Sequence, residues 1–260
     1  MNATIAAQMT GADFLKLRKK RGTVIWASIL ALAPLVIYFI VSAAQHSSDA
    51  AKHAPAGGTS GYIDGIRILA LFFGPLAAIM IGTDAGAGDV ASGVFRDLVV
   101  TGRSRVALFA SRAPAALGVT WLVMLVGYAL LLIGTYAFAS GGETPSTSAV
   151  INGLLFTLFS TGVICVVAVG FASLTASRPA ALTALIGWQL VASPILASIS
   201  SLGSSRKLIL SQAIVHFSPV HVGDRGGTIA MSQGTAIVVA LVWLALFLAL
   251  GAWRTRTMDA

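Results

Sequence analysis

Charged residues are scarce in this chain. Asp, Glu, Lys and Arg make up 10% of its 260 residues, whereas hydrophobic residues make up 57%. A soluble domain typically carries about 25% charged residues, so the composition excludes an ordinary soluble protein and predicts an integral membrane protein. We expect one membrane domain, with no room for a soluble catalytic module.

Cysteine and histidine are rare, and their positions disfavour several chemistries. Cys165 is the single cysteine, so an internal disulfide is excluded, and one thiol is not a metal site. It lies in an apolar run, where we expect it to pack in the core. The four histidines all fall outside the apolar runs. We therefore expect no haem ligand or rhomboid-like protease histidine within the bilayer, and no metal site.

A phosphate-binding loop is also missing. Such a loop needs the pattern G-x-x-x-x-G-K-[ST] at the start of a helix, and the nearest stretch, GDRGGT at 223–228, lacks the lysine. We therefore expect that this chain binds no cofactor and does not hydrolyse ATP itself.

Six apolar runs are long enough to cross about 30 Å of hydrocarbon as helices. The runs are residues 24–43, 62–83, 113–138, 149–174, 180–199 and 235–253. The first run is longer than the apolar core of a usual signal peptide, so we expect it to be retained as a helix. These runs predict an all-α polytopic membrane protein. We divide it into a tail with an amphipathic helix (1–22), a six-helix domain (23–254) and a second tail (255–260).

The net charge of +8 indicates the orientation rather than a nucleic-acid partner. No basic patch is interleaved with stacking aromatics, which disfavours nucleic-acid binding. Basic residues accumulate on the cytoplasmic side of membrane spans. With a cytoplasmic N-terminus, twelve of the 17 Lys and Arg residues fall on that side. We predict a multi-pass protein of the cell inner or plasma membrane with both termini in the cytoplasm.

Two further segments are predicted to lie along the lipid bilayer. In the stretch GADFLKLRKKRG, apolar Phe14, Leu15 and Leu17 alternate with five basic residues. This pattern favours a short amphipathic helix on the inner leaflet, with its cations at anionic headgroups; a simple stop-transfer charge cluster is the alternative. The last outer loop, residues 200–234, contains KLILSQAIVHFSPVHVG. This stretch is too short to span, and it predicts an interfacial or re-entrant helix ending before Pro219.

Residues 82–112 interrupt the apolar sequence with three acids, four arginines and five glycines. Ser92 is a candidate N-cap. The following GVFRDLVVT has an apolar stripe at helical spacing, and Gly102 follows where such a helix would end. We predict a short amphipathic cytoplasmic helix that lies on the membrane or docks into a partner.

This segment resembles the membrane subunits of type-2, exporter-like ATP-binding-cassette (ABC) transporters. The family pattern has an acid, then GT-x-R, an apolar pair, a turn and later basic residues. The matching residues here are Asp89, Gly93, Arg96, Leu98, Val99, the turn 101–105 and Arg112. Val94 replaces the usual threonine, and Gly102 replaces a frequent proline. The order of features along the whole chain, from basic N-terminal helix to the WRTR tail, is also similar.

The resemblance implies a coupling helix at about 93–101 that sits in a groove on a separate ATPase subunit. The implied assembly contains two ATPase copies, which carry ATP and magnesium, and a second permease copy, in the lipid bilayer. The implied coupling residues are Asp89, Gly93, Phe95, Arg96, Asp97, Leu98 and Arg105.

The same resemblance implies that spans two and five line the transport path. Polar residues within spans are costly and often functional, and Gln189 and Ser193 lie four residues apart in span five, before Pro194. A helix–helix hydrogen bond is the alternative role for this pair. In span two, Phe72, Phe73 and Met80 flank a predicted kink at Gly74–Pro75; lipid contact is their alternative. An apolar path of this kind favours an amphipathic or hydrophobic small molecule, lipid or peptide as substrate.

Two other function classes stay open. A secondary transporter or channel would usually show charged groups in its spans or internal repeats, and neither is evident. A membrane enzyme is disfavoured because DGIR at 64–67, which is faintly similar to membrane phosphotransferases, lacks the further aspartates of that family. Asp64 and Arg67 have the spacing of a local ion pair, with channel gating as the alternative.

Overall fold

The computed structural model describes residues 3–94, 100, 102, 104–220 and 229–258. It contains helices throughout, and no strand occurs in these ranges. Six helical segments are long and apolar enough to cross a membrane, as expected for a multi-pass membrane protein. Their bounds are Arg21–Ser48, Gly58–Ala91, Arg105–Ala137, Thr147–Thr175, Arg178–Ser198 and Gln233–Thr257.

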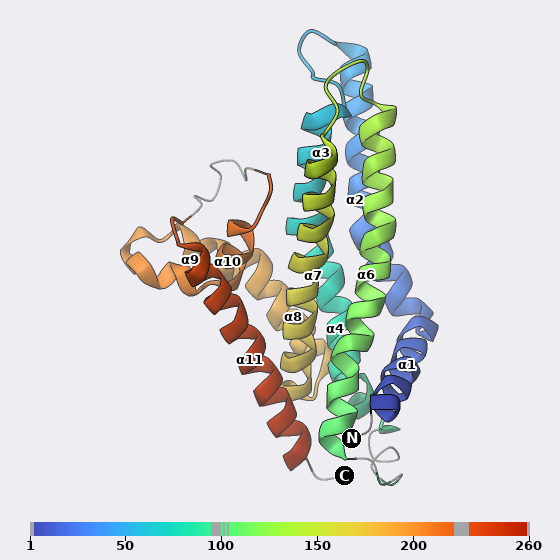
Figure 1. The fold of residues 1–260 in the computed structure, drawn as a ribbon, viewed down its shortest axis with the longest axis vertical. Helices are drawn as coiled ribbons and strands as arrows, with labels where there is room; N and C mark the ends of the chain where they lie inside the picture. Colours follow the sequence, from blue (N-terminus) through green and yellow to red (C-terminus); the bar gives the residue numbers. More distant parts are fainter. Residues whose placement is uncertain (1–2, 95–99, 101, 103, 221–228, 259–260) are drawn as a thin grey trace.

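Four of these spans are single helices, and the other two are divided. Span one is α2 (Arg21–Ser48), span three is α6 (Arg105–Ala137), span four is α7 (Thr147–Thr175) and span six is α11 (Gln233–Thr257). Span two consists of α3 (Gly58–Ile66), η1 (Arg67–Phe73) and α4 (Gly74–Ala91). Span five consists of α8 (Arg178–Gly187), η2 (Trp188–Ala192) and α9 (Ser193–Ser198). Both chain termini lie at one end of the bundle, hereafter the termini end (Figure 1).

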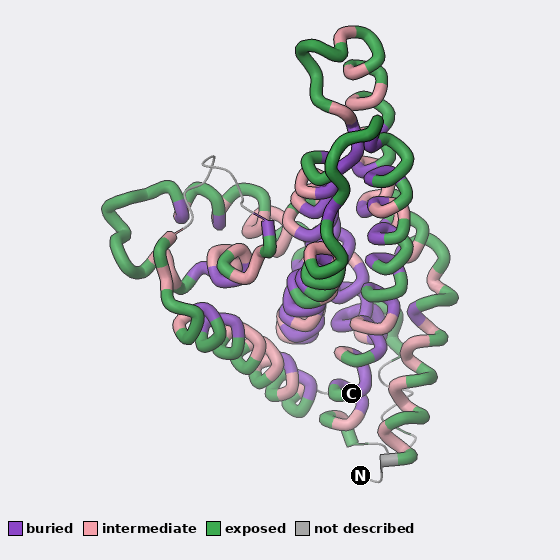
Figure 2. The backbone as a smooth tube through the Cα atoms, turned by 45° about the horizontal axis from the view of Figure 1, so that its top comes forward, coloured by how far each residue is buried: buried purple, intermediate pink, exposed green. Residues whose placement is uncertain are grey.

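Helix α7 is the centre of the bundle, since it packs against α4, α6 and α11. Gly82 and Gly86 of α4 face it in a G-x-x-x-G arrangement, which permits close approach of membrane helices. A Cβ on Gly86 would lie 2.4 Å from the carbonyl oxygen of Val169, and one on Gly82 would lie 2.6 Å from that of Cys165. The buried residues concentrate in these central helices (Figure 2). Cys165 is fully buried there, as predicted.

The predicted kink at Gly74–Pro75 coincides with a π-helical segment, and so does Pro194 in span five. Segment η1 immediately precedes Gly74–Pro75, and η2 immediately precedes Ser193–Pro194. Proline has no N–H and its ring crowds the preceding turn, and a locally wider π turn is one way for a helix to accommodate it. The backbone N–H of Ser193 accordingly bonds the carbonyl of Trp188, five residues back.

Spans two and three extend beyond the predicted bounds toward the termini end. Helix α4 continues to Ala91, where the sequence predicted an end at residue 83, and α6 begins at Arg105 rather than at residue 113. Ser92 was predicted as the N-cap of the following helix, most of which lies outside the described residues. Ser92 ends α4, and its hydroxyl donates to the Gly88 carbonyl at 2.9 Å. A helix ends at its cap residues rather than at the membrane boundary. Helix α4 ends at Ser92, which is followed by Gly93 at φ +74°. Helix α6 begins after Ser104, whose hydroxyl accepts a hydrogen bond from the Ala107 N–H at 3.2 Å.

The N-terminal helix is present as α1 (Ala3–Lys19), but its apolar side faces protein. Leu17 is buried and Phe14 packs against Gly118 of α6, whereas only Leu15 of the three apolar residues is exposed. The expectation that all three enter the lipid is therefore wrong. Helix α6 offers α1 an apolar surface, and burial there removes the side chains from water just as lipid would.

The last outer loop contains short helices, as predicted. They are η3 (Ser200–Leu208) and α10 (Leu210–His216), and α10 packs against α11 beside its upper end (Figure 1). Ile209 is extended between them, and Leu208 is 64% exposed while Ile209 and Ile214 are buried. The predicted ion pair between Asp64 and Arg67 is confirmed at 2.7 Å.

Candidate functional site

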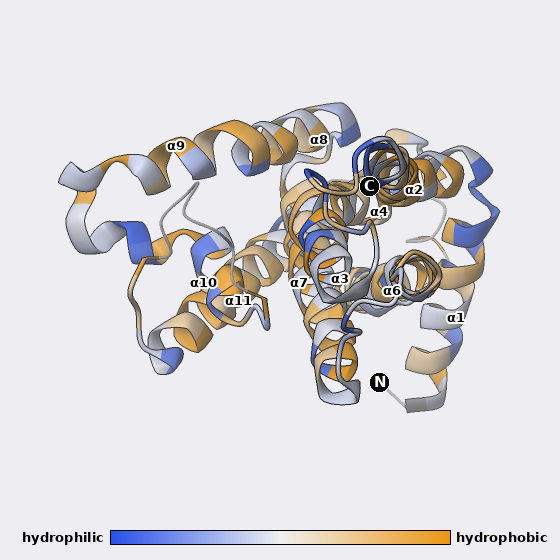
Figure 3. Ribbon diagram, turned by 90° about the horizontal axis from the view of Figure 1, so that it is seen from above, coloured by the Kyte–Doolittle hydropathy of each residue, from blue (hydrophilic) through white to orange (hydrophobic). Residues whose placement is uncertain are grey.

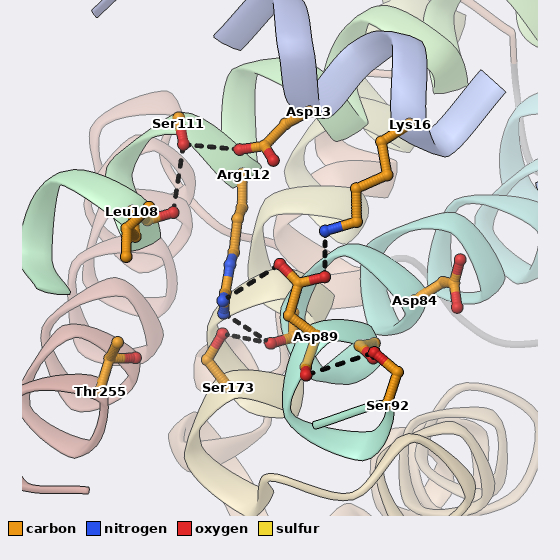
Figure 4. Close-up of polar contacts among 12 residues, drawn as sticks. Asp13, Lys16, Asp84, Asp89, Ser92, Leu108, Ser111, Arg112, Ser173 and Thr255 are labelled. Carbon is orange, nitrogen blue, oxygen red and sulfur yellow. Dashed lines mark hydrogen bonds and ion pairs between the residues drawn. The ribbon is translucent and has the colours of Figure 1, made fainter. Parts of the chain in front are cut away.

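Seven charged residues near the termini end lie between α1, α4, α6 and α8, in two halves around Asp89 and Asp84; Figure 4 shows both aspartates. We call this group the charge cluster. It consists of Asp13, Lys16, Lys20, Asp84, Asp89, Arg112 and Arg178. It joins helices that are far apart in the sequence.

Asp89, in the last turn of α4, is the centre of one half of the cluster. Its carboxylate is 6% exposed and forms an ion pair with Lys16 of α1. The other carboxylate oxygen lies 3.5 Å from the guanidinium of Arg112, which is 3% exposed. Arg112 also donates to the carbonyl of Gly86 at 3.0 Å, an oxygen that accepts from Ser173 of α7 at 3.1 Å as well. Buried charges need partners of this kind because the interior solvates them poorly.

Asp84 is the centre of the second half. Its carboxylate, 3% exposed, lies 3.2 Å from the Lys20 ammonium and 3.4 Å from Arg178 at the start of α8. The hydroxyl of Thr23 in α2 bonds both Asp84, at 3.4 Å, and Arg178, at 3.2 Å. Asp84 thus joins the junction between α1 and α2 to span five. The absence of a side chain at Gly88 is part of this geometry, since a Cβ there would lie 2.7 Å from the Lys20 nitrogen.

Asp13 joins α1 to α6. Its carboxylate accepts a hydrogen bond from Ser111 of α6 at 2.6 Å. Partial burial raises the pKa of the Asp13 carboxyl above its usual value, and nearby Asp89 raises it too. The bond from Ser111 and the positive charges of Lys16 and Arg112 act in the opposite direction without cancelling the effect of burial.

The implied coupling residues fall partly in this cluster. Asp89 lies inside it, and Gly93 forms the turn after α4. Arg105 donates hydrogen bonds to the carbonyls of Arg256 and Met258, and so holds the end of α11. A cation is favourable there because the last carbonyls of a helix are unpaired. The four remaining residues, Phe95, Arg96, Asp97 and Leu98, lie outside the described residues; Val94 and Val100, on either side of them, are helical, and Gly102 has φ +77°.

The predicted path residues differ in how far they are buried. Phe72 is 58% exposed, while Phe73 and Met80 pack partly against the core. In span five, Gln189 is half-buried and Ser193 is buried. The hydroxyl of Ser193 lies 2.5 Å from that of Ser211 in α10 and links span five to the last outer loop. This contact is of the type predicted as the structural alternative for Ser193; the role of these residues in transport stays a prediction.

Sequence reasoning missed the partners of the buried aspartates. Lys16 and Lys20 were interpreted as part of a lipid-facing basic face, whereas Lys16 pairs with Asp89 and Lys20, between α1 and α2, pairs with Asp84. Asp84 and Asp89 are five residues apart, about 140° around an α-helix. Helical spacing therefore gave no signal for these two pairs. Among the described residues, no three His, Cys, Asp or Glu side chains come together in a way that would hold a metal ion.

Comparisons with known proteins give no relative: no model of a protein family matches the chain, and no curated protein matches it either. The site is therefore interpreted from its own geometry. The site links helices, because every carboxylate in it is matched by a cation or a hydroxyl from another segment of the chain.

Proposed function

We propose that this chain is the transmembrane subunit of an ATP-driven transporter of the type-2, exporter-like ABC family. It would export an amphipathic or hydrophobic small molecule, lipid or peptide. A separate ATPase, in two copies with ATP and magnesium, would supply the energy, and a second permease copy would complete the path. The termini end then lies in the cytoplasm. Support comes from the six spans and from the family pattern at residues 89–112.

One observation carries the proposal: the segment between α4 and α6 is braced on both sides. On one side Asp89 joins α4 to α1 and α6. On the other side Arg105 joins the start of α6 to the end of α11. A displacement of this segment would therefore move α1, α4, α6 and α11 together. A loop that only connects two spans needs no such bracing.

In this mechanism Phe95 and Leu98 contact a groove on the ATPase, and Arg96 and Asp97 contribute polar contacts at its rim. ATP hydrolysis in the partner displaces the segment, and Asp89 and Arg105 transmit the displacement to the bundle. Spans two and five, each with a π-helical segment before a proline, change shape along their length. Phe72, Phe73, Met80, Gln189 and Ser193 would contact the moving substrate.

Site-directed cross-linking tests the contact. Cys165 is the only cysteine and is buried, so Cys165→Ser removes the background thiol. Phe95→Cys on this background should cross-link, in native membranes, to a chain that carries G-x-x-x-x-G-K-[ST]. Lys52→Cys, in the loop at the opposite end of the bundle, is the matched control and should not.

A functional variant completes the test. Phe95→Asp should leave membrane insertion intact and uncouple ATP hydrolysis from transport. Normal export by this variant, together with no ATPase attached at Phe95→Cys, would contradict the proposal. Ion currents from the purified chain in bilayers would instead favour the channel or secondary-transporter class.

A further inference from the structure

The junction between α1 and α2 carries exposed positive charge that no carboxylate of the described residues neutralises. Arg18, Lys19 and Arg21 are exposed, and among residues 3–94, 104–220 and 229–258 no carboxylate lies within ion-pair distance of them. The nearest carboxylates are already engaged, Asp84 by Lys20 and Arg178 and Asp89 by Lys16 and Arg112. Strongly hydrophilic residues accordingly gather where α1 meets α2 (Figure 3).

The charge cluster does not offset this excess. Together with the three exposed cations it holds seven positive groups and three carboxylates. Lys20 and Arg178 are also about one-third exposed, with side-chain exposures of 34% and 38%. Both side chains lie beside this junction, where they pair with Asp84.

Exposed apolar side chains continue directly from these cations. On α2, Arg21, Ile25 and Ile29 follow at intervals of four residues and so share one face. Ile25 is 54% exposed, Ile29 is 45% exposed, and the neighbouring Trp26 is 64% exposed. On α1, Leu15 shares the exposed side with Arg18 and Lys19 and is 48% exposed. Tryptophan is enriched where the apolar and polar zones of a membrane meet.

We infer that this surface binds an anionic phospholipid, for which phosphatidylglycerol is a suitable probe. Arg18, Lys19 and Arg21 contact the headgroup phosphate, and the acyl chains lie along Ile25, Trp26 and Ile29. Neither a soluble anion nor a nucleic acid would use the apolar half of the surface, whereas a lipid uses both halves. The bound lipid neutralises the outer side of the same junction whose inner side is neutralised by Asp84 and Asp89.

Quenching of Trp26 fluorescence tests the inference. The protein is placed in nanodiscs that contain phosphatidylcholine and a small fraction of brominated lipid, either phosphatidylglycerol or phosphatidylcholine. The chain has five tryptophans, so the difference between the wild type and Trp26→Phe isolates the signal of Trp26. We expect brominated phosphatidylglycerol to quench Trp26 at least about twofold more strongly than brominated phosphatidylcholine.

Two double variants make the test specific. Arg18→Gln with Lys19→Gln should abolish the preference, since each cation near a membrane surface contributes about fivefold in partitioning. Arg254→Gln with Arg256→Gln removes two exposed cations in the last turn of α11, at the same end of the bundle, and should leave the preference unchanged. Size-exclusion chromatography and thermal unfolding confirm that each variant is folded.

Three outcomes would overturn the inference. The first is equal quenching of wild-type Trp26 by the two brominated lipids. The second is an equal loss of preference in both double variants, which would indicate general surface charge. The third is loss of the preference when inorganic phosphate replaces chloride at the same ionic strength, which would indicate a site for free anions.

Discussion

The carboxylate of Asp89 and the guanidinium of Arg112 lie 3.5 Å apart where α4 and α6 meet, and both side chains are almost inaccessible to solvent. Lys16 of α1 approaches the same carboxylate from the other side. One acidic residue therefore determines how three helices meet beside the segment that we propose as the coupling helix. The structure makes this relationship testable without knowledge of the substrate.

Replacing Asp89 by Asn should destabilise the protein strongly. The change keeps the size of the side chain but removes the charge that faces Arg112 and Lys16, and the loss of one partner of a buried ion pair typically costs about 3–5 kcal/mol. Thermal unfolding in detergent measures the effect. Asp49→Asn is the control, because Asp49 pairs with the largely exposed Lys52; its effect should stay within about 0.5 kcal/mol. Equal unfolding temperatures for the two variants would contradict the structural role of Asp89.

The stability contributed by Asp13 should depend on pH. Its pKa is raised in the folded protein, mainly by burial, so the folded state holds the proton more tightly than the unfolded state. Below its ordinary pKa of 3.8 the carboxyl is protonated in both states, and its burial then favours the folded state most. As pH rises through the higher folded pKa, the buried carboxyl must ionise and the free energy of unfolding falls. Asp13→Asn is neutral at every pH, so its thermal stability relative to the wild type should rise as pH increases above about 4 and should level off above the raised folded pKa. A difference that is constant with pH would show that the charge of Asp13 is not the cause.

Gly86 should not tolerate a methyl group. A Cβ at this position would lie 2.4 Å from a backbone oxygen of α7 and 2.8 Å from the Cβ of Ala172, so α4 and α7 would have to separate. We expect Gly86→Ala to destabilise the protein by about 1–3 kcal/mol. Gly187→Ala in α8 is the matched control, since no atom lies within 4 Å of the added Cβ, and it should be neutral or stabilising by up to about 1 kcal/mol. Similar unfolding temperatures for the two variants would show that the close packing of α4 on α7 is not needed.

The positions of the helices were largely predictable from the sequence, because an apolar run in lipid must form a helix to satisfy its backbone. All six predicted spans are present. Their ends were less predictable at 83–113, where the sequence becomes polar while α4 and α6 continue. Glycines 82 and 86 suggested a loop by composition, whereas in the structure they permit the contact with α7.

The candidate site was only partly predictable. Asp89 and Arg105 were chosen from the family pattern, and the structure gives each of them a partner that the pattern did not indicate. Ser111 and Ser173 carry no signal in the sequence, since single serines in apolar helices are common. Their roles depend on the Asp13 carboxylate and the Gly86 carbonyl, which come from other helices.

The sequence by itself determined that this is a helical membrane protein with six spans, a basic N-terminal helix and broken helices in its last outer loop. These properties follow from the composition and the hydrophobic periodicity of each segment, because the hydrophobicity of a segment decides whether it lies in lipid or in water. Only the tertiary structure decided which charges are buried and with which partners. Lys16 and Asp89 are separated by 73 residues, and Asp13 and Ser111 by 98. Such pairs form when packing brings distant helices together and removes their charges from water, and no local pattern contains that information.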